Sequence, residues 1–155
     1  MRDNDIASVF GFFTEIGIIA QLSQAMLAKA LPDGVHPAHF AIVNHMVRLG
    51  DGCTPQQLAS AHQVTKGTMT HSLGVLSRHG FVRIEPHPTD GRSKIVYLTD
   101  SGRAFREQAI GSVSAMFGQV LDDDHHALMR QAMRSLHEIR VLLDKNREPP
   151  KPPQG

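Results

Sequence analysis

Residues 54–80 read TPQQLASAHQVTKGTMTHSLGVLSRHG and have the pattern of two helices joined by a tight turn. Thr54 and Gln57 match a capping box, and Pro55 between them takes the first helical position. Thr65 is placed to cap the second helix, and a glycine follows its predicted end. The stretch therefore predicts a helix-turn-helix, whose core-facing residues would be Leu58, Ala61, Met69, Leu73 and Leu76.

The next residues, 81–99, read FVRIEPHPTDGRSKIVYLT and predict a β-hairpin. Residues 81–85 and 94–98 are rich in β-branched and aromatic side chains, as strands are. Residues 86–93, with two prolines and an Asp-Gly pair, would form the connecting loop. A hairpin directly after a helix-turn-helix indicates a winged helix-turn-helix.

Long apolar helices are predicted on both sides of this module. Residues 5–31 carry apolar side chains at spacings of three and four, and Asp122–Asp124 begin a last helix with the same pattern. His36 and Pro37 would start the helix that precedes the helix-turn-helix, and Thr99 would cap the helix that follows the hairpin. Apolar faces this extensive need a partner, so the sequence predicts a symmetric dimer.

The predicted fold is mainly α with a small β-hairpin, in a single domain of residues 1–155. A winged helix-turn-helix at residues 36–99 is flanked by dimerisation helices at 5–31 and 100–145. The proline-rich residues 146–155 are expected to form a flexible tail.

Composition narrows the class of protein. The net charge is +1, but residues 54–99 carry five basic and two acidic side chains, which favours a polyanionic partner there. Cys53 is the only cysteine, so no intrachain disulfide can form. No signal-peptide pattern is visible, and the most apolar run contains Glu15 and Gln21. That run is shorter than the roughly 18 apolar residues of a membrane span, so we expect a cytoplasmic protein without a membrane partner.

The second helix of a helix-turn-helix enters the major groove of DNA with its N-terminal residues leading. Threonine hydroxyls can bond base edges or phosphates, and a lysine there offers a phosphate contact. Arginine at the tip of a hairpin is suited to a narrow minor groove, and Asp90 could hold that loop or the guanidinium in place. Double-stranded DNA is thus the expected partner, with candidate contacts Thr65, Lys66, Gly67, Thr68, Thr70, His71, Asp90, Arg92 and Lys94.

Several of these motifs resemble the MarR family of bacterial transcription regulators, over about residues 5–145. The segments that carry the resemblance are Thr65-x-x-Thr68-Met69-Thr70, Arg78-His79-Gly80-Phe81-Val82, Asp90-Gly91-Arg92-Ser93 and Leu98-Thr99-Asp100-Ser101-Gly102. The resemblance implies a homodimeric regulator, often a repressor, on a pseudo-palindromic operator. It also implies release by a small, frequently aromatic or phenolic, ligand.

Three positions depart from the family pattern. The family often has arginine where His71 and Ile84 stand, and an acidic residue where Gly74 stands. These differences bear on base preference and phosphate contacts rather than on the fold. A histidine at position 71 would also make DNA binding depend on pH.

Other kinds of site have little support in the sequence. We find no nucleophile–base constellation, no phosphate-binding glycine loop and no zinc-ligand spacing, so we expect no enzyme, no cofactor and no metal site. Cys53 is expected to be a packed, inert thiol. Candidates for a small-molecule effector pocket are Phe13, Gly17, His36, His39 and Phe40. Two alternatives stay open: an interaction module that has lost DNA binding, and a metal-responsive regulator.

Overall fold

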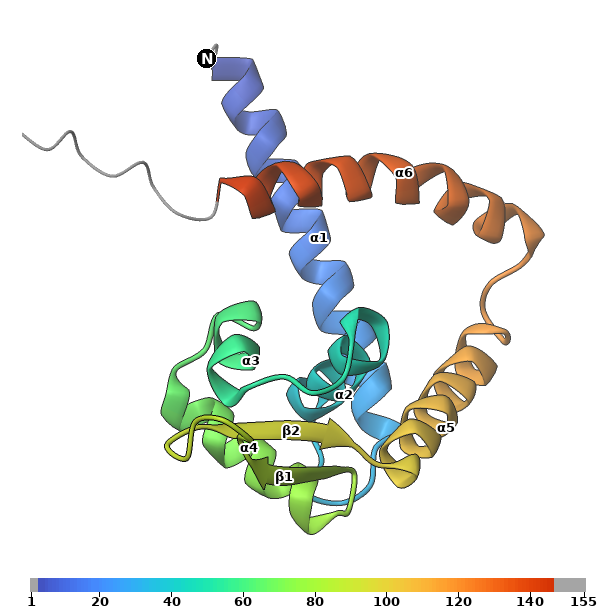
Figure 1. Cartoon of the computed structure of the whole chain (residues 1–155). Helices are drawn as coiled ribbons and strands as arrows, with labels where there is room; N and C mark the ends of the chain where they lie inside the picture. The colour runs from blue at the N-terminus through green and yellow to red at the C-terminus, as the bar shows by residue number, and fades with distance from the viewer. Residues whose placement is uncertain (1–2, 147–155) are drawn as a thin grey trace, which may run out of the picture. The chain divides into compact units, whose positions relative to one another are not determined.

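The computed structural model describes residues 3–146 and contains, in that part of the chain, six helices and one antiparallel hairpin (Figure 1). The elements follow in the order α1 (Asp3–Lys29), α2 (Pro37–Leu49), α3 (Pro55–Ala61), α4 (Lys66–Arg78), β1 (Val82–Pro86), β2 (Lys94–Leu98), α5 (Asp100–Phe117) and α6 (Asp123–Lys145). The predicted fold class is confirmed. The first strand begins and ends one residue later than expected, and the expected tail lies, from residue 147 on, outside the described residues.

The helix starts use the side chains that the sequence indicated. Thr54 Oγ1 accepts the Gln57 N–H at 3.2 Å, and Gln57 Oε1 accepts the Thr54 N–H at 2.8 Å. Thr65 Oγ1 accepts the Thr68 N–H at 3.1 Å. Caps of this kind stabilise a helix by about 1 kcal/mol each, which matters most for a helix as short as α3.

The chain divides into two compact units, residues 1–115 and 116–155. The core of the first unit lies where α2, α3, α4 and the hairpin meet. Leu58, Leu73 and Leu76 are at most 2% exposed there, as predicted. Ala61 is only half-buried because α3 ends at that residue, and Ala59 faces the core instead. Further core residues are Val43, Met46, Met69, Val82 and Val96.

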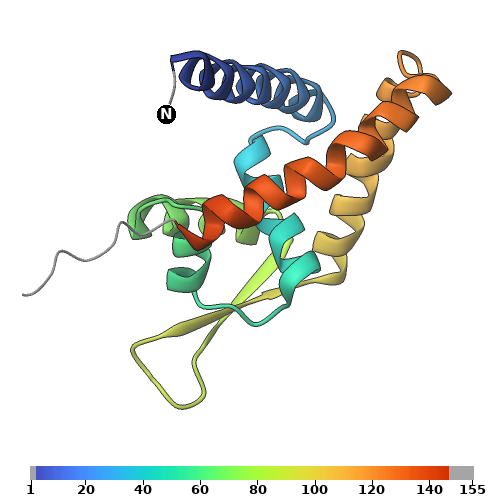
Figure 2. The same ribbon diagram turned by 90° about the horizontal axis from the view of Figure 1, so that it is seen from above.

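The hairpin pairs Val82 with Leu98 and Ile84 with Val96, and its loop extends away from the helices (Figure 2). Thr99, directly after β2, connects three elements. Its hydroxyl donates to the Gly80 carbonyl at 2.6 Å, just past the end of α4, and accepts the Gly102 N–H at 3.0 Å in the first turn of α5. The end of α4, the helix that the sequence predicts to enter the major groove (the recognition helix), and the start of α5 are thereby joined through one side chain.

Helix α1 contacts α2 and leaves most of its apolar side chains exposed. Phe10 is 75%, Ile19 62% and Leu22 63% exposed. The helix is longer than the apolar run considered from the sequence, and by length and composition alone residues 5–29 could cross a membrane. A single helix of this kind near the N-terminus is weak evidence, because helices that pack in soluble proteins pass the same test.

In the second unit, Asp122 caps the start of α6, since its carboxylate accepts the His125 N–H at 3.0 Å. No residue of this helix is buried within the chain. Large apolar side chains along the helix remain exposed, among them Leu128, Met129, Met133, Leu136, Leu142 and Leu143. Like α1, this helix needs a further apolar surface to cover it.

Candidate nucleic-acid interface and cavity

All nine residues proposed to contact DNA are exposed, and they lie on two neighbouring elements. Six are on α4 or at its cap, and three are in the hairpin loop or at the start of β2. The opposite face of α4 is buried, with Met69 1% and Leu73 2% exposed. The recognition helix therefore has one face anchored in the core and one polar face open to a partner.

The threonines on that face differ in how much of their hydrogen-bonding capacity remains free. Thr65 Oγ1 caps the helix and also bonds Thr68 Oγ1 at 2.9 Å, so both hydroxyls already have partners. Thr70 Oγ1 donates to the Lys66 carbonyl at 2.8 Å. With its proton used in this way, the Thr70 oxygen can only accept from DNA, while its methyl group stays available for a thymine methyl.

The hairpin loop owes its shape to Asp90. Its Oδ1 accepts the Arg92 N–H at 3.1 Å, and its carbonyl accepts the Ser93 N–H at 2.9 Å. Of the two roles considered for Asp90, the structure records the hydrogen bond to the loop backbone. His87 supports the same loop, since its Nδ1 accepts the Thr89 N–H at 3.3 Å.

A cleft of about 290 Å³ lies between the start of α3, the recognition helix and the hairpin. Its ten lining residues include the cations Lys66, Arg92 and Lys94 and no carboxylate. Among the residues that the structure describes, no ion pair joins any of these three cations to an acidic side chain. Three uncompensated positive charges around one concave surface attract a polyanion strongly.

Sequence reasoning missed part of this cleft. Thr54, Gln56 and Ser93 line it beside the predicted residues. Gln56 carries no signal of its own in the sequence, because its exposure toward the cleft follows only from how α3 packs against α4. Ile84, where relatives often have arginine, also lines the cleft and gives it an apolar wall.

The neighbouring Arg83 is held in a different way. Its guanidinium pairs with Glu85 and lies over the Tyr97 ring at 4.4 Å from the centroid. Successive strand residues point to opposite faces, so Arg83 faces away from the cleft that Ile84 lines. The hairpin thus carries one arginine engaged within the protein and one, Arg92, without a carboxylate partner among the described residues.

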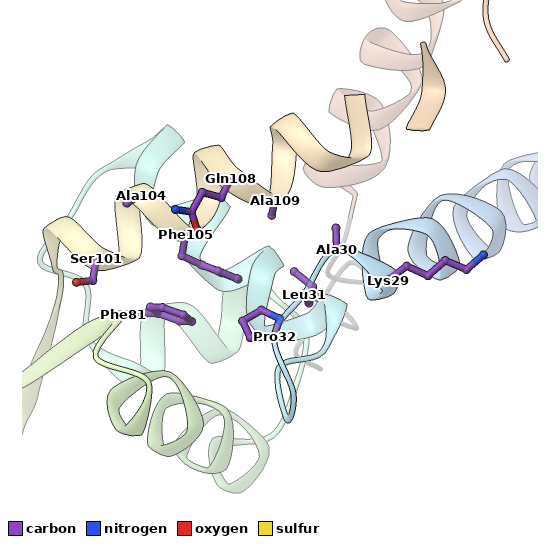
Figure 3. A pocket seen from close by; sticks show the side chains of 10 residues that line it. All are labelled: Lys29, Ala30, Leu31, Pro32, Phe81, Ser101, Ala104, Phe105, Gln108 and Ala109. Atoms are coloured by element: carbon purple, nitrogen blue, oxygen red, sulfur yellow. The ribbon is translucent and has the colours of Figure 1, made fainter. Parts of the chain in front are cut away.

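A second cavity, of about 530 Å³, lies where the end of α1 meets α5 (Figure 3). Phe81 and Phe105 both line it and stack directly on each other, with ring centroids 4.2 Å apart. Leu31 and Pro32 face them from the segment after α1, while the Lys29 ammonium points away from the rings (Figure 3). Ser101 and Gln108 add polar groups, so the lining combines aromatic rings with side chains that can form hydrogen bonds.

None of the five effector candidates named from the sequence lines this cavity. Phe40 comes nearest, because it packs edge-on against Phe105 with centroids 6.1 Å apart. Phe13 and Gly17 lie exposed on α1. His36 and His39 sit at the start of α2, where the backbone N–H of His36 donates to His39 Nδ1 at 3.0 Å.

Metal and thiol chemistry gain no support. Within residues 3–146 no group of three histidine, cysteine or acidic side chains is placed to hold a metal ion. Burial, and then the nearby Asp51 carboxylate, raise the pKa of the Cys53 thiol. A raised pKa keeps the thiol protonated at neutral pH, which is the opposite of what a redox-sensing cysteine needs.

The comparisons with known proteins agree with this geometry. A model of the MarR family matches residues 33–93. The transcriptional activatory protein BadR of Rhodopseudomonas palustris is 28% identical over 115 residues, which cover 72% of this chain and 64%, just under two thirds, of BadR. The crystal structure of apo wild-type MarR from E. coli is 25% identical, with a TM-score of 0.66 over 79% of this chain and 94% of that one.

A DNA complex has the same fold. The structure of reduced AbfR bound to DNA aligns with a TM-score of 0.74, over 96% of this chain and 100% of that one. At 17% identity this likeness concerns the fold alone.

Proposed function

This chain belongs to the MarR family of DNA-binding transcriptional regulators, and we propose that it is a homodimeric repressor that a small ligand releases from a pseudo-palindromic operator. It is a regulator rather than an enzyme, as are the proteins it matches. The dimer, the symmetry of the operator, the direction of regulation and the ligand are the parts that we propose.

One observation carries the proposal: the cleft in which Lys66, Arg92 and Lys94 face the same space as Thr70. The lysines would neutralise backbone phosphates, which gives affinity that falls steeply with salt. Thr68, Thr70 and His71 would lie against base edges in the major groove. Arg92, on a loop shaped by Asp90, would enter the adjacent minor groove.

The exposed apolar faces of α1 and α6 support the dimer. A two-fold interface uses the same patch from both copies, so a second copy of the chain can cover each of these faces. Two recognition helices related by that axis would meet half-sites about one helical turn apart, which is why we expect a pseudo-palindromic operator.

The cavity between α1 and α5 is our candidate for the effector site, in place of the five residues named from the sequence. A flat ring bound beside Phe81 and Phe105 would push on α5 and on the residue that begins the hairpin. Because Thr99 joins α5 to the end of α4, such a push would reach the recognition helix.

The test of the function is a gel-shift assay with the DNA upstream of the gene, at two salt concentrations. Replacing Arg92 with alanine should weaken binding by about 1–3 kcal/mol, the usual cost of losing a specific arginine contact. Arg83→Ala is the matched control, since it removes an arginine of the same hairpin that faces away from the cleft. Equal losses of affinity in the two variants would show that Arg92 does not contact DNA. If wild type failed to retard the DNA even at low salt, the chain would be an interaction module that does not bind DNA.

The cavity allows a separate prediction. Ala104 lines it from α5, and phenylalanine at that position would fill part of its space. We expect millimolar phenol or benzoate to release DNA from wild type but not from Ala104→Phe, while both bind DNA equally without a ligand. The measurement is fluorescence anisotropy of labelled DNA. Release of both proteins at the same ligand concentration would place the effector elsewhere.

The direction of regulation needs its own assay, because BadR is an activatory protein. A reporter gene under the bound DNA should be expressed more strongly when the regulator gene is deleted. Weaker expression after deletion would make this chain an activator.

A further inference from the structure

The start of α2 is capped by a group that can titrate. The His36 N–H donates to Nδ1 of His39, three residues on, at 3.0 Å. Helix α3 has the same arrangement with a different acceptor, since the Thr54 N–H donates to Gln57 Oε1 at 2.8 Å. A glutamine oxygen accepts at any pH, whereas an imidazole nitrogen accepts only while it carries no proton. The α2 cap therefore exists only while His39 is neutral.

The surroundings of His39 disfavour its charged form. The residue is 5% exposed. The groups that act on it electrostatically are His36 at its own helix cap and His71 and His79 on α4, and burial followed by these three imidazoles lowers the pKa of His39. No carboxylate is among them.

Charged groups on the other elements around α2 are placed elsewhere. Lys29 of α1 points away from the cavity rings (Figure 3). Lys94 of β2 lines the cleft between α3, α4 and the hairpin. Arg106 of α5 donates to Asn44 at 2.9 Å. The environment of His39 is thus set by burial and by other histidines.

Helix α2 is in contact with the recognition helix through the protein core. Helix α2 packs against α4, and Val43 shares one buried core with Met69 and Leu73. At the end of α4, His79 stacks on Phe81 with centroids 5.5 Å apart. A change at the start of α2 would therefore alter the surface on which the recognition helix rests.

We propose that the hydrogen bond from the His36 N–H to His39 Nδ1 is a proton-sensitive cap, and that its loss on acidification loosens the support of the recognition helix and weakens DNA binding. The statement about DNA rests on the proposed function, whereas the statement about helix stability does not.

The sign follows from linkage. In the folded chain the pKa of His39 lies below its unfolded value of about 6.5. The stabilisation is complete above that unfolded value and is lost as pH falls from about 6.5 through the folded pKa, because the unfolded chain takes up the proton first. Burial, and then the neighbouring His45, also lower the pKa of His62. His62 therefore contributes a further loss of stability as the pH falls.

The variant His39→Gln separates these effects, because glutamine keeps the acceptor that α3 uses and cannot titrate. Losing a cap costs about 1 kcal/mol, or roughly a factor of five. From about pH 7.5 to about pH 5.5, wild type should therefore lose roughly fivefold more in its unfolding equilibrium than His39→Gln. Its operator affinity should fall more than that of His39→Gln as the pH passes through the folded pKa of His39. His62 is present in both proteins, so its contribution cancels in the comparison.

Two measurements decide the matter. Urea unfolding at the two pH values tests the cap without DNA, so a chain that fails to bind DNA still gives a result. The amide resonance of His36 in wild type should move with the titration of the His39 ring, which needs no variant to fold. Identical pH profiles of stability in wild type and His39→Gln, or a His36 amide that ignores the His39 titration, would overturn the proposal. A pH effect on stability without one on DNA binding would overturn only its DNA part.

Discussion

Replacing Gly102 with alanine adds only one methyl group, yet we expect this change to destabilise the first unit strongly. A Cβ at this position would lie 2.1 Å from the carbonyl oxygen of Phe81 and 2.9 Å from Leu98 Cδ2. The same carbonyl accepts the Thr99 N–H at 3.2 Å, so it cannot move without breaking the junction between the hairpin and α5. We expect a loss of about 3 kcal/mol or more in the free energy of unfolding, measured by urea denaturation.

Gly111 on the same helix provides the matched control. No atom lies within 4 Å of a Cβ built there, so Gly111→Ala removes only the flexibility of glycine. That change should stabilise α5 by about 0.5–1 kcal/mol. If Gly102→Ala unfolded at the same urea concentration as wild type, the close contact between Gly102 and the Phe81 carbonyl would not exist in solution.

The second large effect concerns the apolar face of α1. Ile19 and Leu22 are three residues apart, so they share one side of the helix, and both are more than 60% exposed in the single chain. Changing both to glutamate would place four carboxylates in a two-fold interface, because each change occurs twice. We expect a monomer by sedimentation and a loss of operator affinity of about 100-fold or more, since the two half-sites would no longer be bound together.

The control for charge alone is Gln24→Glu, at an exposed polar position of the same helix. It should remain dimeric and bind DNA almost as wild type does. A dimeric Ile19→Glu/Leu22→Glu protein would show that α1 is not part of the interface. The stability of the winged helix, measured separately by unfolding, should change little in either protein, because α1 contributes few side chains to that core.

Much of the fold could be predicted because the deciding interactions are local. The capping box of Thr54 and Gln57 and the cap at Thr65 each depend on residues three apart in the chain. Helical spacing likewise identified Met69, Leu73 and Leu76 as the inner face of the recognition helix. The same face assignment left the opposite side of α4 for DNA, with six of the nine candidates, and the local pattern of the hairpin supplied the other three.

The remaining features depend on segments distant in the chain. Nothing near Gln56 indicates that it shares a cleft with Lys94, and nothing near Leu31 indicates a cavity closed by Phe105. The sequence candidates for an effector site were chosen from α1 and α2, whereas the cavity uses the segment after α1 together with α5.

The sequence by itself determined which segments become helices and strands, where they start, and which face of each is apolar, because caps, turns and periodicity act within a few residues. Only the tertiary structure decided that three cations surround one cleft and that Gly102 has no room for a methyl group. It also decided that His39 is buried and accepts a hydrogen bond at the start of α2. The burial of a side chain, the distance between charged groups and the close contact of atoms depend on how segments far apart in the chain pack. Local sequence patterns therefore do not predict them.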